Sequence, residues 1–250
     1  MKNNFKEIYN DSLNKPEEFW KNVSDDVFWF KKPTKILNKS NPPFYKWFED
    51  GVTNTCYNAI DIHIDKGNGE KTALIYDSPI TDSKAKYTYK ELKEKISKFA
   101  GALDNQGIKK GDRVIIYMPM IPEAVIAMLA CGRIGAIHSV VFGGFASNEL
   151  ASRIDDSKAK ILITASCGFE PGRTVEYRPL VDGALKLAKH NVERVIFFQR
   201  KDHEVKLNSP LEISWEEDLL MPKIKIVLRL EQMNLPTFYI HLELLEYQKV

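Results

Sequence analysis

The 250-residue sequence lacks paired cysteines. Its three cysteines, Cys56, Cys131 and Cys167, lie far apart and form no Cys-x-x-Cys pair. Disulfide-stabilised domains and cysteine-based zinc sites depend on even-numbered or closely spaced cysteines, so neither class is indicated. We expect three buried, reduced thiols, because unpaired cysteine is among the most buried residue types.

A dominant charge and a long apolar run are also absent. The chain carries 36 Lys and Arg against 34 Asp and Glu, so its charge gives no reason to propose nucleic acid or an anionic membrane as a partner. No apolar run approaches the roughly 18 residues of a membrane-spanning helix. The N-terminus lacks the apolar core of a signal peptide. We therefore expect a soluble, cytoplasmic protein.

Three motifs that would reveal an active site directly are missing. The sequence has no Walker phosphate loop, no Gly-x-Gly-x-x-Gly fingerprint and no His-Glu-x-x-His. His138 lies in an apolar stretch without an evident Ser or Asp partner, which favours a core histidine over a catalytic one. Asp155 and Asp156 point in different directions on a helix, which favours solvated carboxylates over a metal site. We therefore assign no catalytic or metal-binding residue.

The first 65 residues are rich in aromatic residues and Asn and poor in β-branched runs. Pro16 suits the first position of a helix, with Asn14 as its candidate cap and Glu17 and Glu18 in the first turn. The remainder predicts short helices and loops, whose tryptophans pack the segment onto a larger body.

From Thr72 onward, short apolar stretches alternate with segments of helical periodicity. One helix follows Thr88, which stands in capping-box spacing with Glu91. Pro122 opens the next helix and Gly135 closes it. Unbroken apolar strands between helices predict parallel β-α-β units covered on both faces, which is an α/β fold. The expected strands are TALIYD, RVIIYM, AIHSVV, KILITA and RVIFFQ.

Two strand-to-helix connections are candidate ligand sites, because ligands of open parallel sheets bind beyond the carboxyl ends of the strands. In VVFGGFAS, Gly143 and Gly144 follow a strand and precede a helix with Ser147 as its candidate cap. In the long loop SCGFEPGRTVEYR, Arg173 is suited to clamping a phosphate. A simple tight turn and a solvated arginine stay open as the alternatives.

Three stretches together resemble the N-terminal portion of the AMP-forming acyl-CoA synthetases, close to the acetyl-CoA and propionyl-CoA synthetases. They are SNPPFYKWFEDGVTNTCYNAIDIHI, the run from YTYKELKEK to KAKILITA, and EPGRTVEYRPL. The resemblance covers roughly residues 1 to 220. It implies that residues 1–65 are the N-terminal segment of such an enzyme and that residues 66–220 are part of its AMP-binding, adenylate-forming domain.

The resemblance implies a ligase that uses ATP, Mg and coenzyme A. Such enzymes convert a short carboxylic acid, here propionate or acetate, to an acyl-adenylate and then replace AMP by the thiol of coenzyme A. In the family, Gly144 borders the route of the thiol. Glu170, Pro171, Gly172 and Arg173 match the segment that binds coenzyme A, with Arg173 facing its phosphates. Acetate-activating members usually carry a second Arg in place of Glu170, which favours propionate.

Residues 221–250 depart from the family pattern. The ATP phosphate loop, Tyr-Thr-Ser-Gly-Thr-Thr-Gly-x-Pro-Lys-Gly, should follow ISWEEDLL and is absent. The residues Met233 to Val250 can be written with permitted codons whose third bases are chosen to fit. When this DNA is read from the third base of the first codon, it encodes Glu-Pro-Thr-Tyr-Ile-Leu-Tyr-Thr-Ser-Gly-Thr-Thr-Gly-Ile-Pro-Lys-Gly. We hypothesise a frame slip near Leu220 and an out-of-frame tail. This chain alone is then expected to be inactive, with coenzyme A as the one ligand it could retain.

Two other functions stay open from the sequence. One is a non-catalytic module that binds coenzyme A or a nucleotide. The other is one half of a split synthetase that a second polypeptide completes. A dehydrogenase is disfavoured, because the dinucleotide fingerprint is missing.

Sequencing the gene and its downstream region tests the frame slip. We expect codons for the phosphate loop in a shifted frame beyond Leu220, because the first two bases of most codons are nearly fixed by the protein sequence. An intact frame, or a downstream region without synthetase-like codons, rejects the hypothesis.

Overall fold

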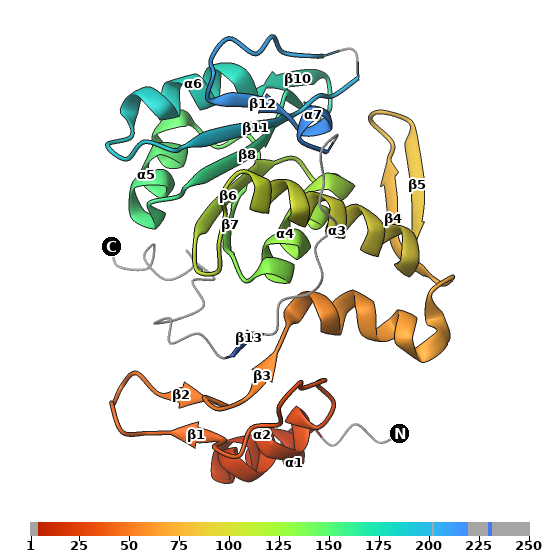
Figure 1. Ribbon diagram of the computed structural model, residues 1–250, viewed down its shortest axis with the longest axis vertical. Coiled ribbons are helices and arrows are strands. Elements are labelled where there is room, and N and C mark those ends of the chain that lie inside the picture. Colours follow the sequence, from red (N-terminus) through yellow and green to blue (C-terminus); the bar gives the residue numbers. More distant parts are fainter. Residues whose placement is uncertain (1–4, 202, 220–229, 232–250) are drawn as a thin grey trace.

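The computed structural model describes residues 5–201, 203–219 and 230–231 (Figure 1). Its centre is a parallel sheet in the strand order β12–β11–β8–β6–β7. The strands are β6 (Arg113–Met118), β7 (Ile137–Phe142), β8 (Ile161–Ala165), β11 (Arg194–Phe198) and β12 (Glu212–Ser214). The expected α/β fold is confirmed, and four of the five expected strands lie in this parallel sheet. The expectation is wrong for TALIYD, because the strand Thr72–Ser78 pairs antiparallel with Ser83–Thr88 in a separate hairpin.

Two pairs of helices cover the sheet. Helix α3 (Tyr89–Asn105) packs on α4 (Pro122–Ile134), and α5 (Ser147–Ser157) packs on α6 (Tyr177–Leu187). The α3–α4 pair lies apart from the α5–α6 pair (Figure 1). Helix α4 leads from β6 to β7, whereas α5 leads back across β6 to β8. Because such crossovers are right-handed, the reversal places the two pairs on opposite faces of the sheet.

The core is built around β6 and β8, two of the three strands that have a partner on each side in this sheet. β6 is buried from Val114 to Met118, and β8 is buried throughout. The helix between residues 89 and 105 turns its expected face inward, with Leu92, Ile96, Phe99 and Leu103 all buried. All three cysteines are buried and free, as expected.

Local signals place two helix boundaries where the sequence predicts them. The Thr88 hydroxyl accepts a hydrogen bond from the N–H of Glu91, and the Glu91 carboxylate accepts one from the N–H of Thr88. This capping box begins α3. Pro122 begins α4, and Gly135 ends it in a left-handed conformation at φ 73°.

Two predicted caps are wrong. Ser147 is the first residue of α5, Ala146 precedes it at the cap, and the Ser147 hydroxyl donates to the carbonyl of Leu180 on α6. Asn14 is the last residue of the preceding helix, and Lys15 stands at the start of the helix that Pro16 opens. Packing between helices takes the Ser147 side chain away from its own helix end.

The N-terminal segment consists of short elements. They are α1 (Phe5–Asn14), α2 (Pro16–Ser24), β1 (Leu37–Asn38), β2 (Lys46–Trp47), β3 (Val52–Thr53) and two π-helical turns, Tyr57–Asp61 and Ile64–Asn68. An antiparallel hairpin of β4 (Thr72–Ser78) and β5 (Ser83–Thr88) leads into α3. Strand β5 is an element that the sequence pattern did not predict.

A buried ion pair joins the N-terminal segment to the core. The guanidinium of Arg133 on α4 donates two hydrogen bonds to Asp61, at 2.8 and 3.0 Å, and both side chains are almost fully buried. Lys93 on α3 adds a contact of 3.0 Å to the same carboxylate. Burial raises the pKa of Asp61, but the hydrogen bonds and charges of Arg133 and Lys93 outweigh it and hold that pKa below 3.8.

Two parts of the chain differ from the sequence-based prediction, and the C-terminal part continues past the last predicted strand. The expected loop after β8 is an antiparallel hairpin of β9 (Cys167–Glu170) and β10 (Arg173–Glu176). β7 is not covered throughout, because Val140 and Phe142 are exposed.

Beyond β12 the chain forms α7 (Trp215–Leu219) and β13 (Leu230–Glu231), which pairs with β3. The rest of the predicted out-of-frame tail, 221–250, lies outside the described residues. Among the described helices, none is both long and apolar enough to cross a membrane.

Replacing one partner of the buried ion pair tests its role in stability. We expect Arg133→Met to lower the free energy of unfolding by about 3–5 kcal/mol, because Asp61 then stays buried with only Lys93 to compensate its charge. Because the folded pKa of Asp61 is lowered, this contribution is complete at neutral pH and is lost as the pH falls through that pKa. Urea unfolding at neutral pH measures the change.

Two control variants sharpen the measurement. The double variant Asp61→Leu, Arg133→Met should recover much of the loss, because no uncompensated charge remains. Lys98→Met, which removes an exposed ion pair with Glu94, should change stability little. A single Arg133→Met variant as stable as the unchanged protein would contradict the proposed role of the pair.

Candidate functional site

Two connections meet at the carboxyl edge of the sheet. One joins β7 to α5 through residues 143–146, and the other is the β9–β10 hairpin that follows β8. Both β7 and β8 pair in parallel with β6, so their carboxyl ends lie at the same edge. This edge is where ligands of open parallel sheets bind. All five residues predicted as a coenzyme A site lie in these two connections.

Gly144 lies in the first connection, close to the second. Its φ of 95° belongs to the left-handed region, which glycine adopts without strain. A side chain added at Gly144 would place its Cβ 3.7 Å from the Oε1 atom of Glu170. The structure therefore brings Gly144 and Glu170 together, although 25 residues of chain separate them.

The other predicted residues form the tip of the hairpin. Pro171 and Gly172 make the turn, with Gly172 at φ 75°, and Glu170 stands opposite Arg173 in the strand register. The Glu170 carboxylate binds Arg173 at 2.7 Å from Nε and 2.6 Å from Nη2. The Arg173 side chain is 71% exposed. Exposed ion pairs are weak, so a phosphate can replace the carboxylate on this guanidinium.

Two tyrosines whose rings pack against each other lie beneath these connections. Tyr117 on β6 donates from its hydroxyl to the carbonyl of Phe145 at 2.8 Å. Its ring centre is 4.9 Å from that of Tyr177, the first residue of α6. Burial raises the pKa of both phenols. Sequence reasoning did not single out either residue. The only signals were a tyrosine inside the apolar run RVIIYM and another at the end of the EPGRTVEY stretch.

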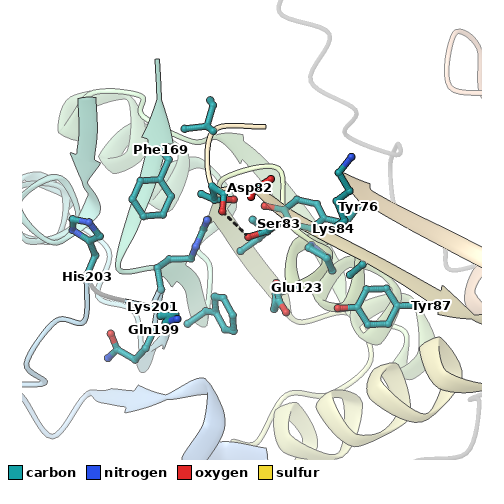
Figure 2. A pocket seen from close by; sticks show the side chains of 17 residues that line it. Tyr76, Asp82, Ser83, Lys84, Tyr87, Glu123, Phe169, Gln199, Lys201 and His203 are labelled. Atoms are coloured by element: carbon teal, nitrogen blue, oxygen red, sulfur yellow. Dashed lines mark hydrogen bonds between the residues drawn. The ribbon is translucent and has the colours of Figure 1, made fainter. Parts of the chain in front are cut away.

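A pocket of about 810 Å³ lies between the β4–β5 hairpin, the start of α4 and the ends of β9 and β11 (Figure 2). Phe169 lines it, and the Arg200 guanidinium lies 4.8 Å from the centre of that ring. Glu123 also lines it, and burial raises the pKa of its carboxyl. Phe169 and Glu170 are consecutive strand residues and point to opposite sides. The pocket therefore does not coincide with the five predicted residues.

The other candidate residues lie outside the two connections. His138 is half-buried on β7, and burial lowers its pKa. Asp155 is not simply solvated, because its Oδ1 atom accepts the backbone N–H groups of Lys189 and His190 at 2.8 Å. Among the described residues, no group of three or more His, Cys, Asp or Glu side chains could hold a metal ion.

Two family models match the sequence along most of its length. The model described as acetyl-coenzyme A synthetase N-terminus matches residues 5–59, and the model described as AMP-binding enzyme matches residues 63–229. The chain belongs to the AMP-binding enzyme family.

Within the AMP-binding enzyme family, this chain is similar to several named CoA synthetases. Acyl-CoA synthetase short-chain family member 3, mitochondrial, of Mus musculus is 53% identical over 209 residues, which are 83% of this chain and 31% of the mouse protein. Acetyl-coenzyme A synthetase of Streptomyces coelicolor is 47% identical over 199 residues, 80% of this chain and 30% of that protein. The chain thus spans about a third of the length of these relatives.

The solved structure shares the fold. Acetoacetyl-CoA synthetase from Streptomyces lividans superposes with a TM-score of 0.77 at 22% sequence identity, and the match covers 89% of this chain and 34% of that one. This likeness agrees with the α/β arrangement around the parallel sheet.

A methyl group at Gly143 tests how tightly the first connection is packed. Its Cβ would lie 2.2 Å from the Tyr177 hydroxyl oxygen and 2.8 Å from the Met118 carbonyl oxygen. We expect Gly143→Ala to lower the free energy of unfolding by about 1–3 kcal/mol, because the backbone must shift to relieve the overlap. Urea unfolding provides the measurement.

Gly132→Ala is the matched control. Gly132 lies inside α4, and its added Cβ would meet its nearest neighbour, the Cys56 nitrogen, only at 4.0 Å. This variant should leave stability unchanged or raise it by up to about 1 kcal/mol, because alanine favours a helix interior over glycine. Equal effects of the two substitutions would show that the Gly143 connection moves freely.

Proposed function

We propose that this chain is the N-terminal part of an AMP-forming ligase that joins a short carboxylic acid to coenzyme A. The reaction converts acid, ATP and coenzyme A to acyl-CoA, AMP and pyrophosphate. A carboxylate is a poor electrophile, and adenylation supplies AMP as its leaving group. The observation that carries the proposal is the meeting of Gly144 with the Glu170–Arg173 hairpin at one sheet edge, in a chain of the AMP-binding family.

Within this proposal the two connections bind the two ends of coenzyme A. Gly144 leaves open the path of the pantetheine arm, since it carries no side chain. Arg173 presents an exposed guanidinium to the phosphates, and Pro171 and Gly172 hold it at the tip of the hairpin. Glu170 holds the guanidinium in place until a phosphate exchanges with it, as the 2.6–2.7 Å contacts of the ion pair support.

Propionate is the acid we favour over acetate. Glu170 stands where acetate-activating members usually carry a second arginine. Residues outside the 250 of this sequence would form most of the acyl pocket.

We assign no residue of this chain to the phosphates of ATP or to Mg. The sequence does not contain the Tyr-Thr-Ser-Gly-Thr-Thr-Gly stretch that would surround those phosphates. Charge develops on pyrophosphate during adenylation, and rate enhancement requires groups already oriented toward it. We therefore propose that these 250 residues alone do not form an adenylate, as the frame-slip hypothesis requires.

Calorimetric titration with coenzyme A tests the binding role of Arg173. We expect Arg173→Ala to weaken binding about tenfold, because one charge-assisted contact to phosphate is lost. Glu170→Gln should strengthen binding, since the carboxylate that competes with phosphate for the guanidinium is removed.

Lys66→Ala is the control for non-specific attraction, because Lys66 is an exposed cation outside both connections. It should leave the affinity unchanged. Equal losses from Arg173→Ala and Lys66→Ala would contradict a phosphate site at the hairpin. They would favour general charge attraction instead.

Exchange of labelled pyrophosphate into ATP tests whether this chain alone forms an adenylate. We expect no acid-dependent exchange with propionate or acetate, because the groups that stabilise pyrophosphate are absent. Acid-dependent exchange by the purified chain would refute this. A co-purifying polypeptide that restores thioester formation would favour the split synthetase, whereas coenzyme A binding without any such partner would favour the non-catalytic module.

A further inference from the structure

Within the part of the chain that the structure describes, the buried hydroxyl of Tyr177 has no hydrogen-bond partner. The residue is 2% exposed, and no other described residue forms a hydrogen bond with its hydroxyl. Most buried polar groups in proteins are hydrogen-bonded, so an exception calls for a reason. A phenylalanine at position 177 would fill the same space without the cost of burying an unpaired hydroxyl.

The hydroxyl lies where two glycines leave room for it. A Cβ added at Gly143, in the first connection, would be 2.2 Å from this oxygen. A Cβ added at Gly168, on β9, would be 2.7 Å from it and 3.1 Å from two carbons of the ring. The Tyr177 hydroxyl oxygen therefore lies between the backbone of Gly143, which precedes Gly144, and strand β9, which ends at Glu170.

Tyr117 provides a direct comparison. It is also fully buried and its ring packs against that of Tyr177, but its hydroxyl donates to the carbonyl of Phe145. Tyr117 therefore fastens the first connection by a hydrogen bond, as a residue that stabilises the fold would. Tyr177 contacts both connections through its hydroxyl and gains no hydrogen bond there.

We propose that Tyr177 is a positioning residue whose hydroxyl sets the spacing between Gly144 and the Glu170–Arg173 hairpin, and so fits the two connections to the two ends of coenzyme A. This inference rests on the proposed function. The spacing matters because the pantetheine arm and the phosphates belong to one molecule, which must satisfy both connections at once. Burial is the main cause of the raised pKa of Tyr177, and the charge of Glu170 adds to it, which agrees with the closeness of the phenol to that hairpin.

Tyr177→Phe separates this role from a structural one by the sign of its effects. The midpoint of thermal unfolding should stay unchanged or rise, because an unpaired buried hydroxyl is removed. Calorimetry should show coenzyme A binding about fivefold weaker. Binding of adenosine bisphosphate, the nucleotide end without the pantetheine arm, should stay within about twofold, since it needs the hairpin alone.

Tyr117→Phe is the matched control on the neighbouring ring. Its hydroxyl has a partner, so its loss should lower the unfolding midpoint by a few degrees. A lower midpoint with unchanged coenzyme A affinity in Tyr177→Phe would overturn the proposal and make this hydroxyl structural. Equal weakening of coenzyme A and adenosine bisphosphate would overturn it as well, because the spacing between the connections would then not be what changed.

A double-mutant cycle with Gly168→Ala tests the spacing without any ligand. Gly168→Ala alone should destabilise the chain by crowding the Tyr177 hydroxyl, and the same change in the Tyr177→Phe background should destabilise it less. Additive effects overturn the proposal. If the unchanged chain binds neither coenzyme A nor adenosine bisphosphate, the proposed function fails. The cycle then still decides whether the hydroxyl sets the distance between the connections.

Discussion

Strand β6 is hydrogen-bonded in parallel to β7 on one side and to β8 on the other. This pairing decides where every later part of the molecule lies, because parallel neighbours bring their carboxyl ends to one edge. The connection after β7 and the hairpin after β8 meet there for that reason. β6 also carries Tyr117, which binds the first connection from below. Residues 114–118 are buried, so the strand cannot shift without disturbing the core.

The Asp61–Arg133 pair is the second interaction on which the arrangement depends. It joins a segment of short elements, with little core of its own, to a helix that packs on the sheet. Asn54 strengthens this junction by donating to the carbonyl oxygens of Gly132 and Arg133 at the end of α4. Taking both charges out of water is costly, so the pair specifies one docking geometry more than it adds net stability.

The candidate site combines an exposed ion pair, which a ligand can replace, with tightly packed residues beneath it. Glu170 and Arg173 form an ion pair in solvent, which a ligand can break at low cost. Beneath them, two tyrosines with packed rings and two glycines fix the backbone at distances that allow no added methyl group at Gly143. Such a base loses little conformational entropy when a ligand binds. The pocket beside Phe169 lies on the other face of the same hairpin, so strand β9 separates this pocket from Glu170 and Arg173.

The sequence alone determined the alternation of strands β6, β7, β8 and β11 with helices α4, α5 and α6, the capping box at Thr88, the helix limits at Pro122 and Gly135, and the family. These features depend on residues a few positions apart, whose conformational preferences act locally. Tertiary structure decided that the expected loop after β8 is a hairpin, that Ser147 bonds to Leu180, and that Asp61 pairs with a residue 72 positions away. It also placed one tyrosine oxygen between Gly143 and Gly168. Such contacts follow from packing whole elements together, and no local pattern along the chain encodes which distant atoms will meet.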